Sequence, residues 1–331
     1  MKGKKKLLAV IFVNIICVLV VLVSIEYIIY CCAKVDYFKY HGEIEEVPPP
    51  PRFLKTYILG YMPQTIQYYN KNLPPLWIRP FSVDDSNTKP PILLFGCSFT
   101  NGTKLLKDEQ TFGAKLSKMT KRNVYNFAMC CCGIQHMLFT IQKYLDKYLP
   151  QDISPEYAIY TYIPDHFYQR MRVTVYPIMF NNGTLLRYTF KNSKLVLEKK
   201  KFPLLTKSYI VKGYYTLTDK SVYKMTKENQ YKNFLLANEL FLESKKELEK
   251  RYPNIKFVIF RYQVENDEEE IIEPPFLWDV FKSEGFRIVN SSDLIGRRFR
   301  YHSEDTAEDG YHPSEAAWDL ILPEFIKKLE L

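Results

Sequence analysis

The stretch PPILLFGCSFTNG, residues 90–102, indicates the fold class of this chain. Its continuous apolar run at 92–95 is typical of a buried strand, and Gly96 ends that run in a loop of small polar residues. In open α/β sheets, such loops at the carboxyl ends of strands collect ligands and catalytic groups. Ser98 therefore lies where a nucleophile is expected. The alternative is that this serine only completes a turn or begins a helix.

Strand-like and helix-like segments alternate from residue 90 to the C-terminus. The expected strands are 92–95, 123–129, 157–163, 255–261 and 286–290. The expected helices are 108–120, 134–148, 228–251, 275–284 and 314–330. This alternation predicts a parallel sheet with helices on both faces. Residues 170–225 interrupt the pattern, and VTVYPIMFNNGTLLRYTF (173–190) predicts two strands around an Asn-Asn-Gly turn, in an inserted hairpin that overhangs one edge of the sheet.

The N-terminus carries an apolar segment behind a lysine cluster at positions 2, 4, 5 and 6. From residue 7 the only polar side chain before Ser24 is Asn14, and this apolar length is sufficient to span the hydrocarbon core of a membrane. No cleavage site for a signal peptide follows it, and the lysines favour a cytoplasmic N-terminus. We predict an uncleaved single-pass anchor that places the rest of the chain in the periplasm or at the cell exterior. The alternative is a buried core helix.

Three regions are predicted along the 331 residues. Residues 1–33 form the lysine cluster and the transmembrane anchor, and residues 34–89 form an extended spacer that contains four consecutive prolines. Residues 90–331 form the α/β domain with its inserted hairpin. The formal net charge is +9, but several of the basic residues flank the anchor and no basic stripe stands out, so we expect no nucleic-acid partner. Nothing in the sequence indicates an oligomeric state.

Cysteine and histidine positions argue against a disulfide framework and against a zinc site. Three of the seven cysteines lie in or beside the anchor, Cys97 precedes Ser98, and 130–132 are consecutive. Adjacent cysteines form a disulfide only with strain. The five histidines, at 41, 136, 166, 302 and 312, lack the spacing of zinc ligands. We expect buried thiols, with no metal and no organic cofactor.

A partner for Ser98 lies near the C-terminus, in EDTAEDGYHPSEAAWDLI (304–321). Asp309 and His312 are three residues apart in a polar loop, and Pro313 precedes the expected last helix. A serine hydroxyl is a poor nucleophile until a base removes its proton, and a carboxylate behind that base stabilises the imidazolium that forms. Taken singly, His312 is explained as a helix cap and Asp309 as a turn residue. Together with Ser98 they predict a catalytic triad.

With these motifs the chain resembles the SGNH (GDSL-type) hydrolase superfamily. The first family block, Gly-Asp-Ser-x-Thr-x-Gly, is matched by residues 96–102, with Cys97 in place of the aspartate. The last block, Asp-x-x-His before a terminal helix, is matched by Asp309 and His312. The resemblance covers residues 90–331 and implies a flavodoxin-like three-layer α/β/α domain.

The resemblance also suggests an oxyanion hole. The family places a glycine after the second strand, where its backbone N–H joins that of the nucleophile. Gly133 in NVYNFAMCCCGIQH (123–136) holds that position, although it could simply open a helix. The third family block supplies an asparagine donor, but the corresponding segment here is YTYIPDHFYQR (160–170). Either His166 replaces that donor, or Asp165 has another role, or the donor is missing, which would cost about 10² to 10³ in rate.

In having a histidine at the end of that strand, the chain resembles outward-facing members of the superfamily that handle acyl groups on surface polysaccharides. The resemblance therefore implies a serine esterase or an acyl (acetyl) transferase, with an acylated carbohydrate or a small ester as substrate. Water as the acceptor gives hydrolysis, whereas a sugar hydroxyl gives transfer. The competing hypothesis is a non-catalytic surface module that uses the same fold to bind glycan or protein.

Overall fold

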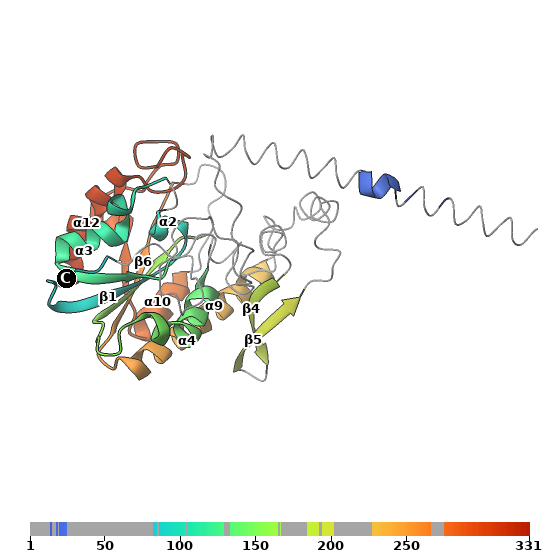
Figure 1. Cartoon of the computed structure of the whole chain (residues 1–331), viewed down its shortest axis with the longest axis horizontal. Coiled ribbons are helices and arrows are strands. Elements are labelled where there is room, and N and C mark those ends of the chain that lie inside the picture. The colour runs from blue at the N-terminus through green and yellow to red at the C-terminus, as the bar shows by residue number, and fades with distance from the viewer. Residues whose placement is uncertain are drawn as a thin grey trace, which may run out of the picture.

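The computed structural model describes residues 82–84, 86–102, 105–128, 133–164, 166, 184–191, 194–201, 227–265 and 275–331, with 14, 18 and 20–24 near the N-terminus (Figure 1). Most of the predicted anchor, and residues 34–81 of the predicted spacer, lie outside this set. Within the described set, no helix has both the length and the apolar character needed to cross a membrane.

A parallel sheet of five strands forms the centre of the domain, in the order β2-β1-β3-β6-β7. Its strands are β1 (Lys89–Phe95), β2 (Arg122–Asn126), β3 (Tyr157–Tyr162), β6 (Lys256–Arg261) and β7 (Arg287–Asn290). Numbered along the chain within this sheet, the order is 2-1-3-4-5, which is the order of flavodoxin-like doubly wound folds. The predicted parallel α/β architecture is confirmed. Because the order reverses between β1 and β3, the carboxyl ends of these two strands flank the crevice where such folds bind ligands.

Helices cover both faces of this sheet (Figure 1). Two apolar cores, one on each face, show which helices belong to which side. One face is covered by α3 (Phe112–Thr120) and α12 (Glu315–Leu329). The other is covered by α4 (Ile134–Lys143), α5 (Leu145–Tyr148), α9 (Lys227–Arg251) and α10 (Pro275–Ser283). The remaining described helices are short: α2 (Ser98–Asn101), η1 (Asp108–Gln110) and α11 (Ser291–Ile295).

Strand β1 shows why its sequence is continuously apolar. Ile92 and Leu94 belong to the core under α3 and α12, whereas Leu93 and Phe95 belong to the core under α4 and α9. All four side chains are at most 1% exposed. A central parallel strand is buried on both faces, so alternation of polar and apolar residues is lost. Fully burying one such side chain contributes about 1.5–3 kcal/mol, which makes this strand a strong determinant of the fold.

A separate antiparallel hairpin consists of β4 (Thr184–Lys191) and β5 (Lys194–Lys201). The predicted strand after the Asn-Asn-Gly turn is β4, while the predicted strand before it lies outside the described residues. The described partner of β4 is β5, which was not predicted. Tyr188 of β4 is 3% exposed and its hydroxyl donates to Gln142 Oε1 at 3.0 Å, so the hairpin is held against α4.

The folded unit also extends before residue 90. Ser82 forms an isolated antiparallel bridge with Val124 of β2, with hydrogen bonds of 3.0 and 2.9 Å between their backbones. This residue belongs to the region predicted as spacer, so the end of that region packs against the sheet.

Candidate active site

Ser98 is placed by a sharp change of direction after β1. Gly96 has φ +148°, and a Cβ at this position would lie 2.4 Å from Thr100 Oγ1. Only glycine accepts both this backbone conformation and this approach. Cys97 then caps the four-residue helix α2, with its sulfur accepting from the N–H two residues on. Ser98 is therefore the first residue of α2, at the carboxyl end of β1, and is 4% exposed.

Two asparagines tie α2 to the loop after β2. Asn101 Nδ2 donates to the carbonyl oxygen of Ala128 at 2.9 Å, and the N–H of Ala128 donates to Asn126 Oδ1 at 3.0 Å. Both asparagines are buried. The segment that follows Ala128, 129–132, contains the three consecutive cysteines and lies outside the described residues. The loop after β2 is thus fixed beside the candidate nucleophile.

The structure brings Asp309 and His312 together as an acid–base pair. His312 Nδ1 bonds to one carboxylate oxygen of Asp309, and the other oxygen accepts from the backbone N–H groups of Tyr311 and His312, each at 3.0 Å. Burial of the carboxyl group opposes its ionisation, but these hydrogen bonds outweigh the burial and lower the pKa of Asp309 to about 2. Asp309 is therefore ionised at neutral pH and can orient the imidazole.

The pair is carried on a small hairpin. Thr306 and Pro313 form an isolated antiparallel bridge, and the N–H of Ala307 donates to the carbonyl of His312 at 2.7 Å. Gly310 at the tip has φ +74°, and a Cβ there would lie 2.1 Å from His302 Nδ1. The tip is therefore closed by contact between the Gly310 backbone and the His302 ring. We call residues 306–313 the catalytic hairpin, after the role that the sequence predicts for Asp309 and His312.

Phe99 joins the two ends of the candidate site. Its ring centroid lies 5.2 Å from that of His312, at an interplanar angle of 51°. Since Phe99 directly follows Ser98, the structure places the acid–base pair beside the helix that carries the candidate nucleophile. Both residues are described, and no hydrogen bond joins Ser98 Oγ to His312. Such bonds are often long in unliganded active sites and tighten when substrate binds.

Gly133 is the N-cap of α4, and its N–H donates to His136 Nδ1 at 3.0 Å. The family resemblance implies that this N–H belongs to an oxyanion hole. That role would require the N–H to turn from His136 to the substrate. The pairing was not predicted. Its signal is visible in the sequence, because His136 stands three residues after the N-cap, where a capping box carries glutamate or glutamine.

His166, the predicted substitute donor, is fully buried at 0% exposure. Its Nδ1 lies 2.8 Å from the hydroxyl oxygen of Tyr160, and its ring centroid lies 5.4 and 6.0 Å from those of Tyr160 and Tyr162. The side chain is thus packed among the aromatic residues of β3. A role as oxyanion donor would therefore require this side chain to become accessible to the substrate. Asp165 lies outside the described residues.

The described part of the chain contains no cluster of three or more His, Cys, Asp or Glu side chains that could hold a metal ion. Cys97, the cysteine beside Ser98, is buried and is not in a disulfide. The groups at the candidate site are therefore a hydroxyl, an imidazole, a carboxylate and backbone N–H groups.

Comparison of the sequence with family models and with curated proteins found no match. Among solved structures, an acetyl xylan esterase from the rumen bacterium Butyrivibrio proteoclasticus has a TM-score of 0.42 and 10% identity, over 73% of this chain and 63% of that one. A protein described as lipolytic and of the G-D-S-L family, from Desulfitobacterium hafniense, has a TM-score of 0.39 and 10% identity, over 72% of this chain and 99% of that one. A salicylyl-acyltransferase from a tetracycline biosynthetic pathway has a TM-score of 0.40 and 9% identity, over 74% of this chain and 56% of that one. At such low identity, the function of this chain has to be inferred from its own residues.

Proposed function

We propose that this protein is a serine-dependent enzyme that transfers acyl groups through a covalent serine ester. The observation that carries the proposal is the Asp309–His312 pair, held beside the helix that begins at Ser98. A carboxylate that orients an imidazole, and an imidazole that takes the proton of a serine hydroxyl, form the arrangement that activates serine for attack on a carbonyl.

The proposed reaction has two steps. In the first, Ser98 Oγ attacks the ester carbonyl while His312 Nε2 takes the serine proton, and the leaving alcohol then departs with that proton. In the second, His312 removes a proton from water or from a sugar hydroxyl, whose oxygen attacks the serine ester. The carboxylic acid or the new sugar ester departs, and His312 returns the proton to Ser98 Oγ. Asp309 keeps Nδ1 of His312 protonated and stabilises the imidazolium. No metal or organic cofactor is needed for these steps.

We further propose acyl esters of cell-surface carbohydrate, or related small esters, as the substrate. This substrate class comes from the sequence resemblance. Among the structures similar in part to this chain, one is an acetyl xylan esterase and one is a family two carbohydrate esterase in complex with cellohexaose. Hydrolysis and transfer differ only in the acceptor of the second step.

The decisive experiment is labelling of the full-length protein, in mild detergent, with a serine-directed fluorophosphonate. Wild-type protein should be labelled, and Ser98→Ala should not. In parallel, the wild type should release acetate from model acetyl esters and the variant should not. If a folded wild-type protein shows neither reaction, the enzymatic proposal fails and the non-catalytic binding module becomes the better hypothesis.

We also propose that the α/β domain lies outside the cytoplasm, tethered by the N-terminal segment. The lysine cluster before residue 7 and the apolar run that follows it carry this proposal. A reporter that is active only outside the cytoplasm, fused after Leu331, should be active. Activity from a cytoplasmic reporter alone would contradict both the location and a cell-surface substrate.

A further inference from the structure

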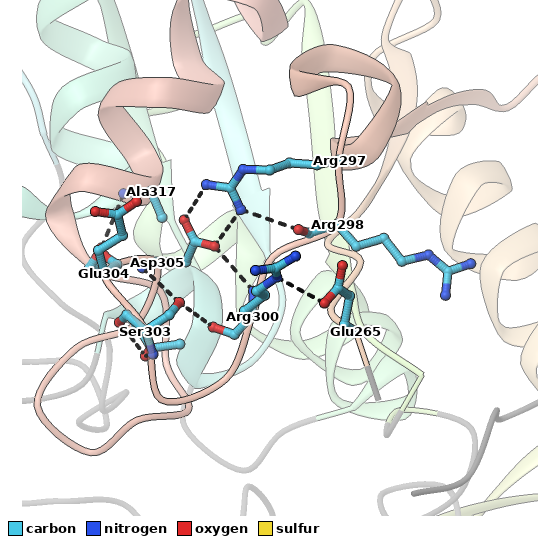
Figure 2. Close-up of polar contacts among 10 residues, drawn as sticks. Glu265, Arg297, Arg298, Arg300, Ser303, Glu304, Asp305 and Ala317 are labelled. Carbon is cyan, nitrogen blue, oxygen red and sulfur yellow. Dashed lines mark hydrogen bonds and ion pairs between the residues drawn. The ribbon is translucent and has the colours of Figure 1, made fainter. Parts of the chain in front are cut away.

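The base of the catalytic hairpin is held by a buried carboxylate, Asp305, which is 4% exposed. Its two oxygens accept from Arg297 Nη1 and Nη2 at 2.5 and 2.7 Å, and one of them also accepts from the backbone N–H of Arg300 at 3.1 Å. Figure 2 shows the guanidinium of Arg297 facing this carboxylate. A two-pronged pair of this kind fixes orientation as well as distance.

The main chain of Asp305 connects this pair to the catalytic hairpin. Its carbonyl accepts from the N–H of Ser314 at 3.0 Å, directly outside the Thr306–Pro313 bridge. Ser314 is itself fixed, because its hydroxyl donates to the carbonyl of Glu304 at 2.7 Å and caps α12. Both ends of the catalytic hairpin therefore meet at Asp305 and Ser314, one residue outside the bridge.

Arg297 belongs to a segment that is anchored just beyond the end of β6. Phe299 bridges in parallel to Val264 beyond the end of β6, and its N–H donates to the carbonyl of Gln263 at 3.0 Å. The ring of Phe299 stacks on that of Tyr262, with centroids 4.6 Å apart and planes 5° apart. Tyr262 in turn contacts Phe99 edge to face at 5.5 Å. The anchor of the Arg297 segment thus also contacts the helix that carries Ser98.

We propose that the Arg297–Asp305 pair is a positioning device that holds Asp309 and His312 at the correct place relative to Ser98. The inference rests on the proposed function for its catalytic consequence. Asp305 contacts neither member of the acid–base pair and acts through the backbone of the catalytic hairpin. Removing Arg297 would leave a buried carboxylate without its main partner, and removing the carboxylate would break the link between the base of the hairpin and the Arg297 segment.

The structure offers a matched control on the same segment. Arg300 Nε donates to Glu265 Oε2 at 3.0 Å, but the Arg300 side chain is 66% exposed and reaches no part of the catalytic hairpin. Arg300→Ala removes this exposed ion pair and keeps the backbone N–H that Asp305 accepts. It therefore changes charge and surface contacts while leaving the proposed device in place.

The test compares Asp305→Asn, Arg297→Lys and Arg300→Ala in the full-length protein. For turnover of an acetyl ester, Asp305→Asn should lower kcat about 10- to 100-fold with KM changed less than about twofold, as expected for misplacement of the catalytic groups. Arg297→Lys keeps the positive charge but cannot form the two-pronged pair with Asp305. Its kcat should lie between that of Asp305→Asn and that of the wild type. Arg300→Ala should match the wild type. The proposal would be overturned if Asp305→Asn and Arg300→Ala had equal kcat values, or if Asp305→Asn raised KM and left kcat unchanged.

A second readout is independent of activity. The imidazole N–H that His312 shares with Asp309 should give a low-field proton resonance, assigned by its loss in Asp309→Ala. Asp305→Asn should broaden or abolish this resonance, and Arg300→Ala should keep it. If the wild type has the resonance but neither turns over esters nor reacts with fluorophosphonate, the proposed function fails and the resonance alone decides the positioning role. If circular dichroism shows that Asp305→Asn does not fold, Arg297→Lys takes its place in both measurements. A kcat and a low-field resonance equal to those of the wild type would then overturn the proposal.

Discussion

The ring of His312 lies against the ring of Phe99, with centroids 5.2 Å apart, and Phe99 is the residue that follows Ser98. One contact thus joins the short helix α2, which follows β1, to the hairpin that precedes the last helix. The contact is apolar, so it positions the imidazole without using either of its nitrogens. Nδ1 remains bonded to Asp309, and Nε2 is the nitrogen available to a nucleophile.

The three triad substitutions should differ in severity. Ser98→Ala and His312→Ala should each remove nearly all ester turnover, because the nucleophile and its base act as one unit. Asp309→Asn should cost about 10² to 10⁴ in kcat, because the carboxylate orients the base but takes no proton. Steady-state kinetics on a model acetyl ester measures this ranking. Equal, small losses in all three variants would contradict the triad assignment, provided that circular dichroism shows each variant to be folded.

Gly96→Ala should disturb the candidate site more than an alanine at another glycine of positive φ. At Gly96 the new methyl group would overlap Thr100 Oγ1 and approach the carbonyl oxygen of Thr161 to 3.2 Å, directly beside Ser98. Gly296, with φ +73° and no neighbouring atom within 4 Å, is the matched control that feels only backbone strain, about 1–2 kcal/mol.

Urea denaturation and the rate of fluorophosphonate labelling should both separate these two alanine variants. We expect Gly96→Ala to unfold at a lower urea concentration than Gly296→Ala, and to react more slowly with the fluorophosphonate. Identical behaviour would mean that the turn after β1 adapts without moving Ser98.

His166→Ala should affect folding first. Because the imidazole is fully buried and bonded to the Tyr160 hydroxyl, its truncation leaves a cavity and a buried hydroxyl without this partner. We expect a loss of about 2–4 kcal/mol in the free energy of unfolding. Tyr160→Phe, which removes only the hydroxyl, should cost about 1–3 kcal/mol.

Turnover distinguishes the two roles considered for His166. If it supplies an oxyanion donor, kcat of the folded Ala variant should fall about 10² to 10³ while Tyr160→Phe retains most activity. If it is a core residue, as its burial favours, the loss of kcat should be small in both variants. An unchanged free energy of unfolding in His166→Ala would contradict the observed packing.

The ionisation of Asp309 should make its contribution to stability depend on pH in the acid range. Its pKa is about 2 in the folded protein, below the ordinary value of about 3.9 expected after unfolding. A carboxyl group whose pKa is lowered by folding stabilises the folded state above the unfolded pKa, and this contribution is lost as pH falls from about 4 towards 2.

The comparison with Asp309→Asn measures this contribution. Wild type should exceed the variant by about 1–2 kcal/mol in the free energy of unfolding at pH 6, with allowance for the partly exposed position of the carboxyl group. The difference should shrink at pH 3. A difference that grows at lower pH would show that the hydrogen bonds to the Asp309 carboxylate are not its source.

Local sequence patterns were sufficient to predict the main sheet. Each of its five strands overlaps a predicted segment, because short apolar runs bounded by Gly, Pro or polar clusters are visible without knowledge of distant residues. The hairpin was harder to predict, since β5 (Lys194–Lys201) carries four lysines and its apolar run, 195–197, is only three residues long. It forms as a strand by pairing with β4 along its whole length.

The sequence by itself determined the fold class and the three candidate catalytic residues, since burial periodicity and motif spacing are properties of neighbouring residues. Only the tertiary structure decided which partners these groups meet. It placed the ring of His312 against Phe99, gave the Gly133 N–H to His136, and buried His166 against Tyr160. It also paired Arg297 with Asp305, two charged residues that carry no motif. The physical reason is that contacts between distant side chains depend on how the strands and helices pack, which no local pattern specifies.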